Sequence, residues 1–101
     1  MRVMRVSEFE QWTAEHGIRN YWFDSENSPA EWNGPEISQH YQQLAVSLFY
    51  DQVMFRNPTG TLLLKDVKEV RMFDERGIGQ VFDIVCGKQD DQTRIWRFLA
   101  D

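Results

Sequence analysis

The stretch 80–86, QVFDIVC, decides the fold that we expect for this chain. Its residues alternate between two sets, which are Phe82, Ile84 and Cys86 on one side and Val81, Asp83 and Val85 on the other. A period of two is typical of a β-strand, and both sets are largely apolar. We therefore expect a strand whose Phe82 side faces the core.

The segments on either side of this stretch predict more antiparallel strands. Their residue ranges are 52–56, 61–65, 67–73 and 93–99. Turn-forming residues separate most of them, as in the Asn-Pro-Thr-Gly of 57–60. The pair Lys65-Asp66 fits either a bend or a bulge. The second half of the chain therefore predicts a β-meander of four or five strands.

The first half of the chain predicts a short helix near its start. Ser7 can cap the amide of Glu10, whose carboxylate can reach back to the Ser7 amide. Gly17 can take the left-handed conformation that ends a helix. The apolar stripe of this helix would be Phe9, Trp12 and His16.

A second helix is predicted from Asn33, which can cap the amide of Glu36, with Pro35 in the first turn. Five residues then follow a helical spacing of i, i+4, i+7, i+8 and i+11, and they are Ile37, Tyr41, Leu44, Ala45 and Leu48. Leu44 and Val46 also alternate, so the helix can give way to a strand near Val46. Together these patterns predict an α+β fold with two N-terminal helices on one face of the meander.

Length and composition favour one intracellular domain over residues 1–101. No apolar run approaches the ~20 residues of a membrane span. The first ten residues, MRVMRVSEFE, carry charges that do not suit a signal peptide. The single cysteine, Cys86, excludes an internal disulfide and favours a reducing compartment. We therefore expect a cytoplasmic protein.

One window of the chain, residues 20–55, contains no Lys or Arg and carries a charge of −5, which equals the net charge of the whole chain. We call it the acidic window. Five carboxylates and several large aromatic residues share this window. The residues we expect to contact a partner are Asp24, Glu26, Glu31, Glu36, Tyr21, Trp22 and Trp32, with the aromatic ones as anchors or supports. Acidic groups among aromatics suit a surface that binds a basic protein. The same acidity opposes direct binding of nucleic acid.

Motifs for catalysis, cofactors or metals are weak in this sequence. Glu36 and His40 are four residues apart on the predicted helix, but two ligands do not make a metal site. Cys86 belongs to the core-facing set, where a cysteine behaves as an inert hydrophobe. Arg94 and Trp96 mix a cation with an aromatic on one face of the last strand, which suits base stacking less well than a packed strand with Arg97 in solvent. We therefore predict neither an enzyme nor a cofactor.

The function predicted from these features is that of a small acidic inhibitor. It would occupy the basic groove of a partner, such as a nucleic-acid-handling enzyme, with carboxylates that imitate phosphates. In size and charge the chain resembles the small acidic inhibitors of phages and mobile elements, including anti-CRISPR proteins. That resemblance is compositional and implies an anti-defence role.

Two other functions stay open from the sequence. Leu62 and Leu64 lie on one face of the strand 61–65 and Leu63 on the other, which suits a module that self-associates, for example as a homodimer, or docks through its sheet. A small enzyme that uses Glu36, His40 and an aspartate is the third possibility.

Overall fold

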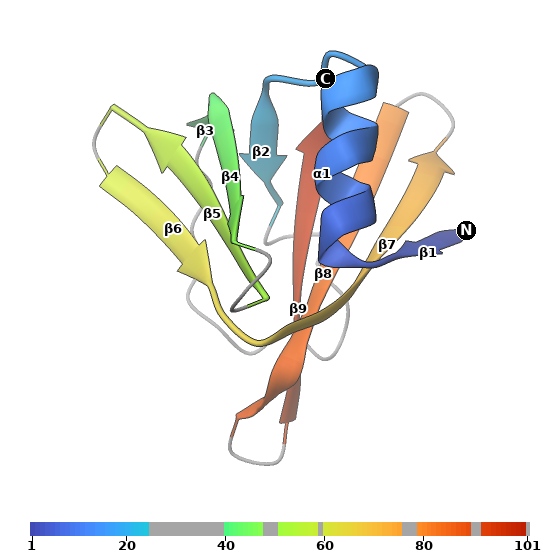
Figure 1. The fold of residues 1–101 in the computed structure, drawn as a ribbon, viewed down its shortest axis with the longest axis vertical. Helices are drawn as coiled ribbons and strands as arrows, with labels where there is room; N and C mark the ends of the chain where they lie inside the picture. The colour runs from blue at the N-terminus through green and yellow to red at the C-terminus, as the bar shows by residue number, and fades with distance from the viewer. Residues whose placement is uncertain (25–39, 48–50, 59, 76–78, 90–91, 101) are drawn as a thin grey trace.

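The computed structural model describes residues 1–24, 40–47, 51–58, 60–75, 79–89 and 92–100 of the chain. Within these ranges the protein is mostly β, with one helix, α1 (Val6–Glu15) (Figure 1). The predicted α+β fold with two N-terminal helices is therefore wrong. Antiparallel pairing in the second half of the chain is confirmed, but its strands divide between two sheets rather than forming one meander.

The predicted second helix is replaced by strands over the part of it that the structure describes. Residues 33–39 lie outside the described ranges, and residues 40–47 form β3 (His40–Tyr41) and β4 (Gln43–Ser47). Leu44 lies opposite Phe55 and Val46 opposite Val53 in the ladder between β4 and the next strand. The alternation of Leu44 and Val46 thus outweighs the helical spacing of Tyr41, Leu44 and Ala45, because a neighbouring strand supplies the hydrogen bonds and the apolar partners.

The strands form a six-stranded and a three-stranded antiparallel sheet. The larger sheet has the order β1 (Arg2–Met4), β7 (Val67–Glu75), β8 (Gly79–Gln89), β9 (Gln92–Ala100), β2 (Tyr21–Phe23) and β3. The smaller sheet has the order β4, β5 (Gln52–Asn57) and β6 (Gly60–Leu64).

The two sheets are joined at two corners where the chain passes directly from one to the other. Between β3 and β4 lies Gln42, whose N–H donates to the carbonyl of Arg56 at 2.9 Å. Between β6 and β7 lie Lys65 and Asp66, and Asp66 has a φ of +54°, a conformation that Asp tolerates. Strands that bend from one sheet into another are typical of orthogonally packed sheets.

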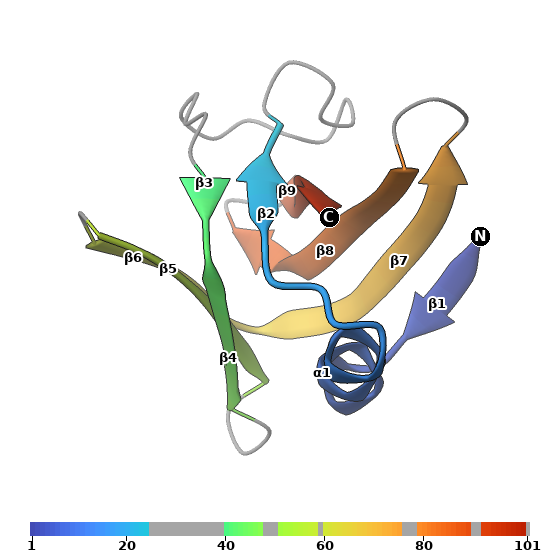
Figure 2. The ribbon, with the colours of Figure 1, turned by 90° about the horizontal axis from the view of Figure 1, so that it is seen from above.

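Helix α1 lies between β4 and β7 (Figure 2). It begins before the predicted Ser7 cap, because the Glu8 carboxylate accepts a hydrogen bond from the N–H of Arg5 at 3.4 Å. Its predicted end is confirmed, since Gly17 has a φ of +65° after the helix. Phe9 is completely buried, and its ring centroid lies 5.0 Å from that of Phe82. The helix therefore packs one aromatic stripe onto the larger sheet.

The core between the two sheets is rich in aromatic side chains. Phe55 of β5 and Phe98 of β9 are both fully buried and stack with ring centroids 4.1 Å apart. The core also contains Phe82 and Ile84, which confirms the predicted facing of β8. Burial of several large aromatics is the main stabilising term for a domain of this size.

The opposite face of β8 and β9 carries a buried ion pair. Arg97 donates to the two carboxylate oxygens of Asp83 at 2.7 and 2.8 Å, and its guanidinium lies 5.8 Å from the centroid of the Phe73 ring. The Asp83 side chain is 3% exposed and that of Arg97 is 21% exposed. The expectation that Arg97 points freely into solvent is therefore wrong, because a bidentate carboxylate lies beside it in register.

Candidate functional site

The structure describes three of the seven residues that we expected to contact a partner, namely Tyr21, Trp22 and Asp24. Glu26, Glu31, Trp32 and Glu36 lie outside the described residues. Tyr21 and Trp22 belong to β2, which lies between β9 and β3 in the larger sheet, and Asp24 follows the end of β2. They differ sharply in how much of each side chain solvent can reach.

Tyr21 is a core residue. It is 1% exposed, its ring lies 5.3 Å from that of Phe55, and its hydroxyl donates to the carbonyl of Ile18 at 3.3 Å. Burial raises the pKa of the Tyr21 hydroxyl, so that the group stays neutral. In the predicted contact surface Tyr21 can thus support its neighbours but cannot touch a partner.

Trp22 is one of the exposed large hydrophobic residues, with 38% of it open to solvent. Its indole stacks on the imidazole of His40 with ring centroids 4.7 Å apart, and the two residues are opposite each other in the β2–β3 ladder. The His40 ring is held in turn by a 3.0 Å hydrogen bond between its Nε2 and Asn20 Oδ1. An ordered, half-exposed indole of this kind is well suited to anchor a protein contact.

Asp24 follows directly after β2 and is half-buried. Its N–H donates to the carbonyl of Arg97 at 3.0 Å, which fixes the backbone where the chain leaves the sheet. Trp22 and Asp24, two residues of the acidic window, therefore lie close together at this end of β2.

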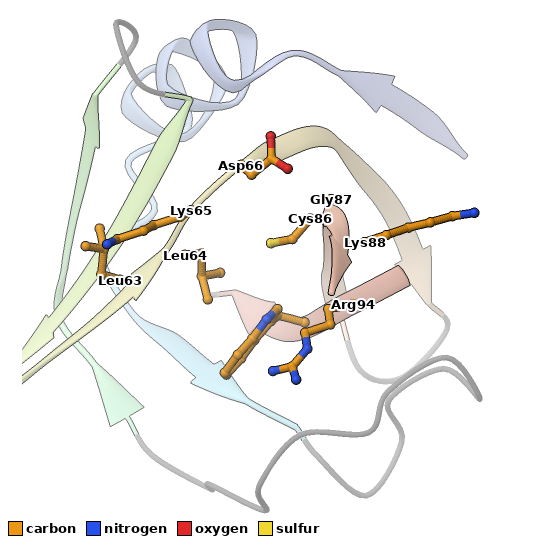
Figure 3. Close-up of a pocket in the computed structure, with 9 residues that line it drawn as sticks. Leu63, Leu64, Lys65, Asp66, Cys86, Gly87, Lys88 and Arg94 are labelled. Atoms are coloured by element: carbon orange, nitrogen blue, oxygen red, sulfur yellow. The ribbon is translucent and has the colours of Figure 1, made fainter. Parts of the chain in front are cut away.

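A cavity of about 390 Å³ lies at the corner between β6 and β7. We call it the corner cavity, and its walls are residues 63–66, residues 86–88 of β8, and Arg94 and Trp96 of β9. Figure 3 shows Leu64, Cys86 and Arg94 around the opening, with Lys65 and Lys88 extending away from it on opposite sides. The cavity thus combines an apolar wall with an arginine.

Arg94 differs from the other residues of the cavity wall in the surroundings of its Nε atom. Its Nε atom is buried and has no hydrogen-bond partner among the described residues. Alternation along β9 gives Arg94 the same facing as Trp96 and Phe98, toward the core side of the sheet. That shared facing was visible in the sequence, whereas the corner that leaves space around Arg94 was not.

The thiol of Cys86 also lines the corner cavity. Cys86 is 8% exposed, and this burial raises the pKa of its thiol to about 11, with the charge of Asp66 adding to the effect. The thiol is therefore protonated near neutral pH and is a poor nucleophile.

Asp66 is the carboxylate of the cavity wall. Its Oδ1 forms an ion pair with Lys68 Nζ at 2.8 Å, and this contact raises the pKa of Lys68. Its carboxylate rests on Gly87, where a Cβ would collide with it, and the Gly87 N–H donates to the Asp66 carbonyl at 2.8 Å. Asp66 is therefore engaged by Lys68 and the β8 backbone.

The other sequence candidates can be placed only in part. His40 is present in the Trp22 stack, but its predicted metal partner Glu36 is outside the described residues. In the described part of the chain, no group of three or more His, Cys, Asp or Glu residues is arranged to hold a metal ion. Among the same residues, no helix is long and apolar enough to cross a membrane.

Comparisons of the chain with protein-family models, with curated proteins and with solved structures find no significant match.

Proposed function

We propose that this protein is a non-enzymatic binding protein that engages the basic surface of a partner protein through its acidic window, residues 20–55. The observation that carries this proposal is the half-exposed Trp22 stacked on His40. It supplies an ordered aromatic anchor at the start of a 36-residue window that holds five carboxylates and no cation. A rigid aromatic beside negative charge is the combination that favours both affinity and steering toward a basic partner.

The partner class that this surface fits is a protein with a nucleic-acid-binding groove. Such a groove presents arginines and lysines that normally hold phosphates, and carboxylates can pair with them instead. Occupation of the groove would inhibit the partner, as expected for an anti-defence protein. This part of the proposal rests on the charge distribution of the sequence.

The proposal is tested by immobilising the protein and comparing which host proteins it retains in nuclease-treated lysate. We expect a basic protein that elutes as salt is raised from roughly 0.1 to 1 M, and that is lost from Trp22→Ala. Leu63→Ala is the matched control, because Leu63 is similarly exposed, at 42%, but lies on the other sheet. Equal retention by Trp22→Ala and the wild type, unaffected by salt, would refute the proposal.

Self-association through β6 is the second candidate function. β6 is one of the two edge strands of the smaller sheet, paired within the described residues with β5 alone, and Leu63 on it is 42% exposed. A free edge with an exposed leucine favours pairing with the same strand of a second copy.

Sedimentation velocity over a range of concentrations tests this candidate. Association through β6 predicts a dimer that Leu63→Lys returns to the monomer and that Trp22→Ala leaves intact. A wild-type protein that remains monomeric at high concentration would exclude it.

A further inference from the structure

The corner cavity is lined by an arginine, Arg94, one of whose nitrogen atoms has no hydrogen-bond partner among the described residues. The Nε of Arg94 is buried and unpaired within the described part of the chain. A buried N–H without a hydrogen-bond acceptor is costly, and such groups are rare in folded proteins. Arg94 as a whole is half-buried and lines the cavity, so an anion from outside the protein can meet its positive charge there.

The remaining groups of the cavity wall do not supply that acceptor. Asp66 is engaged by Lys68 at 2.8 Å and rests on Gly87. The Cys86 thiol carries no negative charge at neutral pH. Lys65 and Lys88 extend outward on opposite sides of the opening and add positive charge at its rim (Figure 3). The local charge is thus positive in a protein whose net charge is −5.

The apolar part of the wall limits the kind of anion that fits. Leu64 and Trp96 line the cavity beside Arg94, and both are packed into the core, with only 2% and 9% of each residue exposed. A volume of about 390 Å³ is near the lower end for small-molecule sites and suits one ring or short chain with its charged group.

We propose that the corner cavity binds a small organic anion, with a carboxylate or phosphate group on the Arg94 guanidinium and an apolar body against Leu64 and Trp96. The planar fork of arginine matches both of these oxyanions and can donate two parallel hydrogen bonds to either. The residues that line this site lie outside the sequence of the acidic window, and the proposed binding does not depend on a protein partner.

Titration by two-dimensional ¹H–¹⁵N NMR tests the site, with benzoate, phenyl phosphate, inorganic phosphate and the neutral amide benzamide as probes. We expect benzoate and phenyl phosphate to shift the Gly87 and Arg94 signals, including Arg94 Nε–H, in a saturable way. Benzamide should bind at least tenfold more weakly, because it lacks the charge. Inorganic phosphate should also bind more weakly than phenyl phosphate, because it lacks the apolar body.

Variants separate this site from general electrostatics. Arg94→Gln should raise the Kd of phenyl phosphate about tenfold or more, since it removes the charged fork. Arg56→Gln is the control, because Arg56 lines a different cavity between α1 and the smaller sheet, and it should leave the Kd unchanged. If Arg94→Gln does not fold, Arg94→Lys, which keeps the charge but loses the fork, should still weaken binding.

Four results would overturn the proposal. They are no shift with any probe up to about 10 mM, equal affinity for benzamide and benzoate, equal affinity for inorganic and phenyl phosphate, and an equal effect of Arg56→Gln and of the Arg94 variant.

Discussion

The two ends of β9 present the same face to the interior but meet very different surroundings. Phe98, near the end of the strand, is fully buried and stacks on Phe55 at 4.1 Å. Arg94, four residues earlier on the same face, lines the corner cavity with an unpaired Nε. Alternation fixes which face a residue joins, whereas the element opposite it decides whether that face becomes core or cavity.

The packed end of β9 should be the more sensitive to substitution. Phe98→Ala is expected to lower the free energy of unfolding by about 3–5 kcal/mol, because it removes a buried ring and leaves a void between the two sheets. Urea unfolding followed by circular dichroism measures this loss. Val3→Ala, at a position that is 52% exposed, should change stability by less than about 0.5 kcal/mol. A loss at Phe98 no larger than at Val3 would mean that the sheets do not pack there.

The next largest effect on stability is expected at the ion pair between Asp83 and Arg97, on the opposite face of β8 and β9. Asp83→Ala should cost about 2–3 kcal/mol, because it leaves Arg97 without its bidentate partner while the guanidinium keeps some access to water. The double variant Asp83→Leu with Arg97→Met should lose less than Asp83→Ala alone, since no unpaired charge remains. A double variant that is worse than the single one would contradict this account of the pair.

The thiol at the open end predicts a loss of stability at alkaline pH. Burial raises the pKa of Cys86 from 9.0 to about 11, so the unfolded chain releases the proton first. Its contribution is fully present below about pH 9 and is lost as pH rises through 11, a decline of about 2 kcal/mol. Unfolding curves between pH 8 and 11 should show a larger loss of stability in the wild type than in Cys86→Ala, which keeps only the loss due to the raised pKa values of Tyr21 and Tyr41. Parallel pH dependence in the two proteins would exclude it.

Most of the strands could be predicted from the sequence, because their alternation persists whatever lies opposite. The facing of Phe82 and Ile84 follows from this rule, as does the antiparallel pairing of β5 with β6. The division into two sheets could not be predicted, since it depends on the two corners at Gln42 and at Lys65–Asp66. Residues 40–47 fit a helix and a strand equally well in isolation, and pairing with β5 decides between them.

The candidate sites could be predicted to a similar extent, because the sequence indicates their residues but not what surrounds them in the fold. The sequence shows that Trp22 and Asp24 belong to the acidic window, and the exposure of Trp22 fits a contact role. It also shows Arg94 on the core-facing side of its strand, an arginine where an apolar residue is typical. The sequence does not show the corner where Arg94 Nε has no partner among the described residues, because Asp66 and Gly87 are 21 residues apart in the chain and meet only in the fold.

The difference between the two ends of β9 is tested most directly by Arg94→Met, measured by urea unfolding beside Phe98→Ala. If the open end is kept for binding rather than for stability, Arg94→Met should raise the free energy of unfolding by about 1 kcal/mol, because an apolar side chain replaces one whose buried Nε has no partner among the described residues. A loss comparable to that of Phe98→Ala would contradict the account, since it would show that Arg94 stabilises the fold as the aromatic core does.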